Sequence, residues 1–189
     1  MKKIFALIIL KIMGWKIVAD MPDGIRKGVL IVAPHTSNWD FVIGRLFFMV
    51  LGIKSRFLIK KESFVGPFGF ILKKLGGIPI DRKNSNNVVN DVAHLFRENK
   101  ELVVIITPEG TRKLTKNWKK GFYYIAELAK VPIIVSFIDY GKKEGGIAFV
   151  FKPTGDYEKD FQPIKELYLT KQAKHPEMFC YSPMYQEKK

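Results

Sequence analysis

His35 and Asp40 are the residues of this chain whose types and spacing could support acid–base chemistry. They lie five positions apart, directly after the apolar run 29–33, at the exit of a predicted buried strand. Histidine is well suited to accept a proton near neutral pH, and a carboxylate on its second ring nitrogen fixes the tautomer and stabilises the imidazolium. The same segment also fits a helix start, with Ser37 or Asn38 as the cap and Asp40 in the first turn, where the helix dipole favours negative charge. The spacing alone leaves both interpretations open.

A second polar group, Glu109, Gly110, Thr111 and Arg112, follows the apolar run 102–107. Glycine permits a close backbone approach, and threonine and arginine supply hydroxyl and guanidinium donors. This combination is suited to binding a phosphate.

Further positive charge follows two other predicted strands. Lys60 and Lys61 come after the run 57–59, and Arg82 comes after the run 78–80. A dianionic head group would require such cations, although a single lysine or arginine after a strand is more often a solvated surface charge or half of a weak ion pair.

The elements that must position these residues alternate along the chain between short apolar runs and longer segments of helical character. This pattern predicts a single α/β domain with a mostly parallel central sheet flanked by helices and an N-terminal apolar helix. In such a sheet the carboxyl ends of the strands meet at one rim, so the three polar groups are expected to converge there. The predicted strands are 29–33, 57–59, 78–80, 102–107 and 133–138 with an edge strand at 145–152, and the predicted helices are 38–51, 64–74, 85–99, 118–130 and 158–174.

Composition limits the classes of partner and cofactor. The 189 residues carry a net charge of +14, which favours anionic partners such as membranes, acidic carrier proteins or nucleic acid. No nucleic-acid-binding module is visible, so nucleic acid is not expected. The single Cys180 excludes an internal disulfide framework, and His94 and His175 lack metal-ligand spacing, so we predict no metal.

Residues 1–20 are predicted to form a membrane-interface helix and its lead-in. Lys11 and Lys16 interrupt the apolar run, which is too short to cross a bilayer, and no small-residue cleavage site follows it. A core helix is the alternative; contact with an anionic membrane surface is favoured by the positive charge. The aromatic residues Trp15, Phe47 and Phe48 are expected in the core.

Four ordered blocks of the sequence resemble those of the glycerolipid acyltransferases, whose prototype is 1-acylglycerol-3-phosphate acyltransferase and whose first block carries an H-x4-D motif. The blocks are Pro-His-Thr-Ser-Asn-Trp-Asp at 34–40, Lys60-Lys61-Glu62 through Gly77-Ile78-Pro79-Ile80-Asp81-Arg82, Pro108-Glu109-Gly110-Thr111-Arg112 and Val131-Pro132-Ile133-Ile134. The resemblance covers about 100 residues in the family's order, and it identifies 21–189 as an acyltransferase domain.

The resemblance implies a role for each matched residue. His35 would deprotonate the acceptor hydroxyl, Asp40 would orient His35, and the oxygen would attack an acyl thioester without an acyl-enzyme intermediate. The acceptor, a lysophospholipid, would be bound by Glu109, Gly110, Thr111 and Arg112, with Arg112 on its phosphate, and Lys60 and Arg82 would lie in the same region. Acyl-CoA or acyl carrier protein would be the co-substrate, with no bound cofactor, and the protein would be peripheral on the cytoplasmic face of the inner membrane.

Several departures from the family pattern leave the acceptor open. Pro34, Ser63, Thr107 and Lys113 stand where family members often have other residues. Another polar lipid acceptor, including N-acylation of an amine, therefore stays an alternative, as does a non-catalytic binder of anionic surfaces. A common lipid hydrolase is disfavoured because the sequence has no Gly-x-Ser-x-Gly nucleophile motif.

Overall fold

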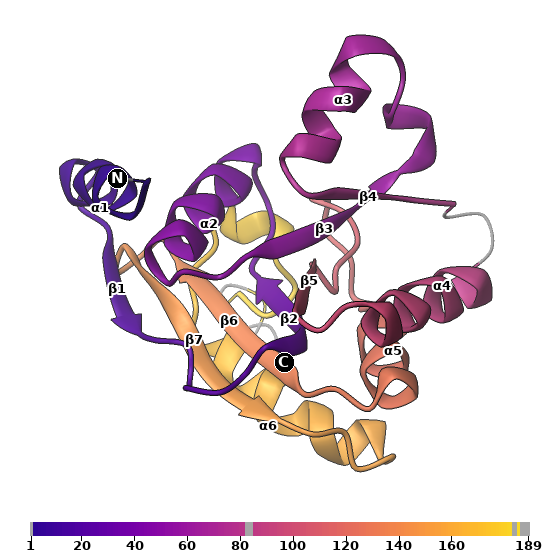
Figure 1. Cartoon of the computed structure of the whole chain (residues 1–189). Coiled ribbons are helices and arrows are strands. Elements are labelled where there is room, and N and C mark those ends of the chain that lie inside the picture. The colour runs from indigo at the N-terminus through magenta and orange to yellow at the C-terminus, as the bar shows by residue number, and fades with distance from the viewer. Residues whose placement is uncertain (1, 82–84, 183–184, 186–189) are drawn as a thin grey trace.

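A mostly parallel sheet forms the centre of the fold (Figure 1). The computed structural model describes residues 2–81, 85–182 and 185, and its strands are β1 (Lys16–Ala19), β2 (Lys27–Ala33), β3 (Ser55–Lys60), β4 (Gly77–Ile80), β5 (Leu102–Ile106), β6 (Ile133–Asp139) and β7 (Glu144–Phe151). They lie in the order β1-β7-β6-β2-β5-β3-β4. The strands from β6 to β4 are parallel to one another, whereas β7 is antiparallel to β6 and β1 is parallel to β7. The predicted α/β class is therefore confirmed.

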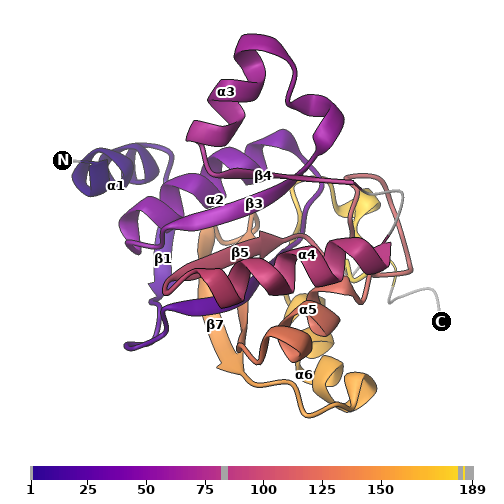
Figure 2. The ribbon, with the colours of Figure 1, turned by 45° about the vertical axis from the view of Figure 1, so that its right-hand side comes forward.

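Helices cover both faces of this sheet (Figures 1 and 2). In the described residues they are α1 (Lys2–Ile12), α2 (Asn38–Val50), α3 (Gly66–Lys74), α4 (Ser85–Glu98), α5 (Gly121–Ala129) and α6 (Tyr157–Leu169), with 3-10 turns η1 (Lys61–Ser63) and η2 (Pro176–Met178). On one face α1 and α2 bury Leu10, Ile43 and Phe47 together. On the other face α4, α5 and α6 form the largest core cluster, which includes Phe96 and Tyr168.

The central strands are apolar along nearly their whole length because both faces are covered. Every residue of β6 is buried, and in β2 only Lys27 and Val32 are partly exposed. Such continuous apolar runs are typical of parallel strands between two helical layers. Trp15, Phe47 and Phe48 are also buried, so their predicted place in the core is confirmed.

The edge of the sheet beyond β6 differs from the prediction. The segment predicted as an edge strand, 145–152, is β7, and it lies inside the sheet because β1 pairs along its other side. The four residues of β1 are too few to give a clear alternating pattern, so this strand was missed.

Two predicted helices have different limits in the structure. The helix predicted at 118–130 begins only at Gly121, and the one predicted at 158–174 ends at Leu169. α6 contains Pro163, and the side chain of Asp156 caps it by accepting a hydrogen bond from Lys159 N.

The parallel arrangement brings four chain segments to one rim. The residues after β2, β5, β3 and β6 all leave the sheet at its carboxyl edge. There β3 and β5 separate, because their pairing ends at Phe57 and Ile105 whereas β3 continues to pair with β4 as far as Lys60. The rim is therefore open between β5 and β3. Within the described residues, the structure has no helix that is long and apolar enough to span a membrane.

Candidate active site

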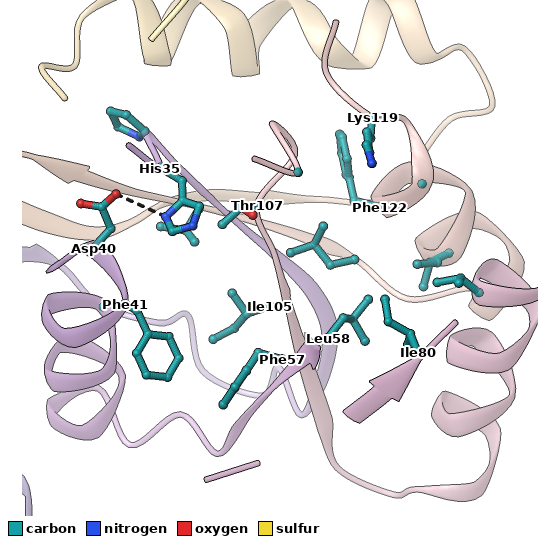
Figure 3. Close-up of a pocket in the computed structure, with 18 of the residues that line it drawn as sticks. His35, Asp40, Phe41, Phe57, Leu58, Ile80, Ile105, Thr107, Lys119 and Phe122 are labelled. Atoms are coloured by element: carbon teal, nitrogen blue, oxygen red, sulfur yellow. Dashed lines mark ion pairs between the residues drawn. The ribbon is translucent and has the colours of Figure 1, made fainter. Parts of the chain in front are cut away.

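His35 lies in the short connection between the end of β2 and the start of α2. Its Nδ1 atom is 3.3 Å from Oδ2 of Asp40, which points back toward the ring from the first turn of α2 (Figure 3). This contact occupies Nδ1 and leaves Nε2 as the ring nitrogen that can exchange a proton with a bound molecule. The pairing predicted from the spacing is present in the structure.

Asp40 is held by four groups at once. Its Oδ2 accepts hydrogen bonds from Thr36 N at 2.7 Å and from Ser37 N at 2.8 Å, and its Oδ1 accepts one from the Tyr140 hydroxyl at 2.7 Å. Ser37 in turn caps α2 by accepting from Trp39 N. The helix-start interpretation is therefore confirmed, and the acid–base interpretation stays a prediction that the same carboxylate could serve.

These donors decide the charge of Asp40. Burial raises its pKa, but hydrogen bonds from His35, Tyr140 and Ser37 outweigh burial, and the pKa lies below its ordinary value. The carboxylate is consequently negative at neutral pH and faces the imidazole.

A second carboxyl group, that of Glu109, contacts the backbone of His35. Its Oε1 accepts a hydrogen bond from His35 N at 2.9 Å, and its Oε2 is buried with no hydrogen-bond partner among the described residues. Burial raises the pKa of Glu109 to about 7, and the backbone hydrogen bonds from His35 and from Glu109 itself lower it only in part. The carboxyl group of Glu109 thus fixes the backbone of the H-x4-D segment at His35. Acceptor binding by Glu109 stays a prediction.

The rest of the predicted anion-binding turn borders an open polar pocket of about 700 Å³. Gly110 has φ of +65°, a backbone conformation that favours glycine, and it lies against the side chain of Lys119. Arg112 is exposed at the pocket wall. The pocket is lined by His35, Thr36, Ser37, Asn38, Thr107, Gly110, Thr111, Arg112, Lys113 and Met178.

A second cavity, apolar and of about 630 Å³, begins at the same histidine and runs toward the gap between β5 and β3 (Figure 3). Its volume is that of a typical small-molecule site. The side chains that line it are mainly apolar and come from α2, β3, β4, β5, α4 and α5; they include Phe41, Phe57, Leu58, Ile80, Val88, Val89, Ile105, Ile106, Phe122 and Ile125. His35, Thr107 and Gly110 border both this cavity and the polar pocket.

One predicted cation, Lys60, is not brought into either hollow by the structure. Lys60 is exposed at the end of β3, on the same rim, and lines neither the cavity nor the polar pocket. Arg82 lies outside the described residues, so its predicted role stays a prediction. Phe122, expected in the core together with Trp118 and Tyr123, is buried as they are, and it also forms part of the cavity wall.

Sequence reasoning missed Tyr140 and Lys119. Tyr140 follows the fully buried strand β6 at the same rim, so the rule that singled out residues after β2 and β5 could have found it. Lys119 lines the apolar cavity beside Gly110 and follows the anion-binding turn by a few residues. Nothing in its local sequence separates it from Lys116 or Lys120.

Comparison with known proteins defines the protein family to which the chain belongs. The sequence model of the family described as "Acyltransferase" matches residues 16–138, most of the chain and all of the H-x4-D and Glu-Gly-Thr-Arg segments. The chain therefore belongs to the acyltransferase family.

One protein of similar sequence and one solved structure of similar fold are both named as specific acyltransferases. The chain is 31% identical over 113 residues to the 1-acyl-sn-glycerol-3-phosphate acyltransferase of Streptococcus pneumoniae (strain ATCC BAA-255 / R6). That match spans 57% of this chain and only 40% of the relative. The crystal structure of the 1-acyl-sn-glycerophosphate (LPA) acyltransferase PlsC from Thermotoga maritima superposes with a TM-score of 0.58 at 15% identity, covering 88% of this chain and 74% of that one. The second similarity shows a shared fold.

Proposed function

We propose that this chain is an O-acyltransferase that moves a fatty acyl group from an acyl thioester to the hydroxyl of a lysophospholipid such as 1-acylglycerol-3-phosphate, in phospholipid biosynthesis. One observation carries the proposal: the His35–Asp40 pair lies where an apolar cavity meets a polar, cation-bearing pocket. A fatty acyl chain needs the first environment and a phosphate head group the second.

The proposed reaction uses His35 as a base and then as an acid. Nε2 takes the proton of the acceptor hydroxyl while that oxygen forms a bond to the thioester carbonyl carbon. When the resulting tetrahedral intermediate collapses, the carbon–sulfur bond breaks and the thiolate receives the proton from the imidazolium. The products are an ester and a free thiol, and no acyl-enzyme intermediate is required.

Asp40 stabilises the imidazolium formed in the first step. Its carboxylate is already oriented by backbone N–H groups and by Tyr140, so little reorganisation is needed when the positive charge appears. Arg112, at the edge of the polar pocket, is the cation we assign to the acceptor phosphate.

The donor is acyl-CoA or acyl carrier protein, and both are anionic partners that suit a chain of +14 charge. We also infer that the protein binds an anionic membrane surface from the cytoplasmic side as a peripheral protein. α1 supports this placement, because Ile4, Phe5 and Ile8 are exposed on it next to its lysines.

The experiment that tests the function offers both donors to the full chain together with several lysolipid acceptors and one amine acceptor, and identifies products by mass. We expect acylated lysophosphatidic acid from the wild type and a loss of at least about 10²-fold in rate for His35→Ala, since a positioned base contributes about 10²–10⁴-fold.

His94→Ala is the matched control, because His94 is exposed on α4 and forms an ion pair with Glu98 on its own helix. Wild-type turnover in His35→Ala would contradict the proposed base. Transfer only to the amine acceptor would replace O-acylation by N-acylation, and salt-sensitive binding without any product would favour the non-catalytic alternative.

A further inference from the structure

α3 is a helix that buries almost nothing. Within its nine residues, Gly69 is the buried one, and in both views α3 projects from the β3–β4 side of the sheet (Figures 1 and 2). The large apolar side chains on and beside it face solvent, with Val65 73% and Phe68 and Phe70 61% exposed. We call Val65, Phe68, Phe70, Ile71 and Leu75 the α3 apolar surface.

Most of this surface forms one stripe. Val65, Phe68, Ile71 and Leu75 recur every three or four residues, a spacing that aligns side chains along one side of a helix. A contiguous exposed apolar stripe is uncommon on a soluble monomer and marks a surface that another apolar phase covers.

The charges around the stripe indicate the nature of that phase. Lys60, Lys61, Lys73 and Lys74 are exposed on or just before α3, and the intervening segment contributes a single acidic residue, Glu62. Lys74 extends along the apolar surface, with its Nζ 4.6 Å from the ring centre of Phe70. Apolar side chains flanked by lysines suit the interface of an anionic bilayer. A second copy of the chain would instead bring like charges together.

The helices α1 and α2 also expose apolar side chains. In both views α2 lies between α1 and α3 (Figures 1 and 2). α1 exposes Ile4, Phe5, Leu7, Ile8 and Ile12, and α2 exposes Phe41 and Val42. Phe41 also lines the apolar cavity and packs edge-to-face on Phe57 of β3 at 5.1 Å. Phe41 thus connects the exposed apolar side chains of α2 to the wall of the cavity.

We propose that the α3 apolar surface is a second membrane-contact element, separate from α1, that inserts into the interface of an anionic bilayer. The proposal concerns binding alone, so it is tested without donor or acceptor and does not depend on the acyl transfer proposed above.

The first experiment measures sedimentation of the full chain with vesicles of phosphatidylcholine, with and without phosphatidylglycerol. We expect Phe68→Ser with Ile71→Ser to weaken binding to the anionic vesicles about 10-fold, because two large apolar side chains lose their contact with lipid. The matched control is Leu114→Ser with Leu128→Ser, two exposed leucines outside α1, α2 and α3, which should leave binding unchanged.

Equal vesicle binding by the α3 variant and the wild type would overturn the proposal. So would a concentration-dependent dimer, detected by light scattering, that the α3 substitutions abolish while vesicle binding persists, since a second copy would then cover this surface.

A second variant keeps the proposal testable even where the double substitution unfolds the chain. In Phe68→Trp the new indole replaces an aromatic ring at the centre of the stripe. We expect anionic vesicles with brominated acyl chains to quench its fluorescence beyond the quenching seen in the wild type, whose exposed Trp39 gives the background. Quenching no greater than in the wild type would place α3 outside the bilayer and overturn the proposal.

Discussion

Asp40 and Glu109 flank His35 with carboxyl groups that are equally buried, at 5% exposure, yet differ in charge. Asp40 accepts hydrogen bonds from two backbone N–H groups and from Tyr140, and it faces the imidazole. Glu109 accepts one from another residue, His35 N, and one from its own backbone. The pKa of Asp40 is lowered despite burial, whereas burial raises the pKa of Glu109 to about 7. Burial is the largest influence on both carboxyl groups, and only at Asp40 do the hydrogen-bond donors and the imidazole together outweigh it.

The two carboxyl groups therefore have different roles. Asp40 supplies a fixed negative charge to the ring of His35, and Glu109 supplies an acceptor to its backbone. Neutralising Asp40 should therefore lower the rate of acyl transfer. Neutralising Glu109 should instead change how the free energy of unfolding depends on pH.

Neutralising Asp40 should have the largest effect. Asp40→Asn keeps an oxygen that can accept from Thr36 N or Ser37 N, but it removes the charge that stabilises the imidazolium. We expect kcat/KM for acyl transfer to fall about 10³-fold, which is about 4 kcal/mol of transition-state stabilisation, measured by product formation at saturating donor.

Asp160→Asn is the matched control for that substitution. Asp160 is also buried, accepts hydrogen bonds from Tyr123 and Thr154, and has a pKa below its ordinary value despite burial, but it lies at the start of α6 and lines neither hollow. The Asp160→Asn protein should be less stable than the wild type but should turn over substrate at the wild-type rate. Equal losses of activity in the two variants would mean that Asp40 matters only for folding.

Neutralising Glu109 should change stability more than chemistry. An acid whose pKa is raised from 4.5 to about 7 on folding keeps its proton longer in the native state, so wild-type stability falls as the pH rises through this window. The decrease is about 3 kcal/mol for a shift of this size. Glu109→Gln cannot ionise, and its amide oxygen can still accept from His35 N.

Urea unfolding of both proteins at pH 4.5 and above 7 measures this difference. The free energy of unfolding of Glu109→Gln minus that of the wild type should rise by about 3 kcal/mol between the two conditions. Any constant penalty from the new amide cancels, because it is the same at both pH values. A difference that does not change with pH would show that the pKa of Glu109 is the same in the folded and the unfolded state.

How far the sequence could predict this site depends on the range of each interaction. His35 and Asp40 could be paired because five residues of chain connect them, and Glu109 could be brought near because consecutive apolar runs imply parallel strands. The contact of Tyr140 with Asp40 joins residues 100 positions apart and depends on β6 lying next to β2. The apolar cavity depends on where β3 and β5 stop pairing, which the composition of either strand does not specify.

Tyr140 provides the smallest and most discriminating test of how Asp40 differs from Glu109. Tyr140→Phe removes one donor from Asp40 and keeps the ring, which packs edge-to-face on Trp15 at 5.0 Å. The pKa of Asp40 should then rise toward that of a carboxyl group with fewer partners, as in Glu109. We expect kcat to fall about 10-fold with KM unchanged, and the acid limb of the pH–rate profile to move to higher pH. Tyr123→Phe, which removes a hydroxyl from the buried Asp160, should lose similar stability without either kinetic change. A Tyr140→Phe enzyme that is less stable but has the wild-type pH profile would limit Tyr140 to packing and leave the backbone donors of Thr36 and Ser37 to hold the charge of Asp40.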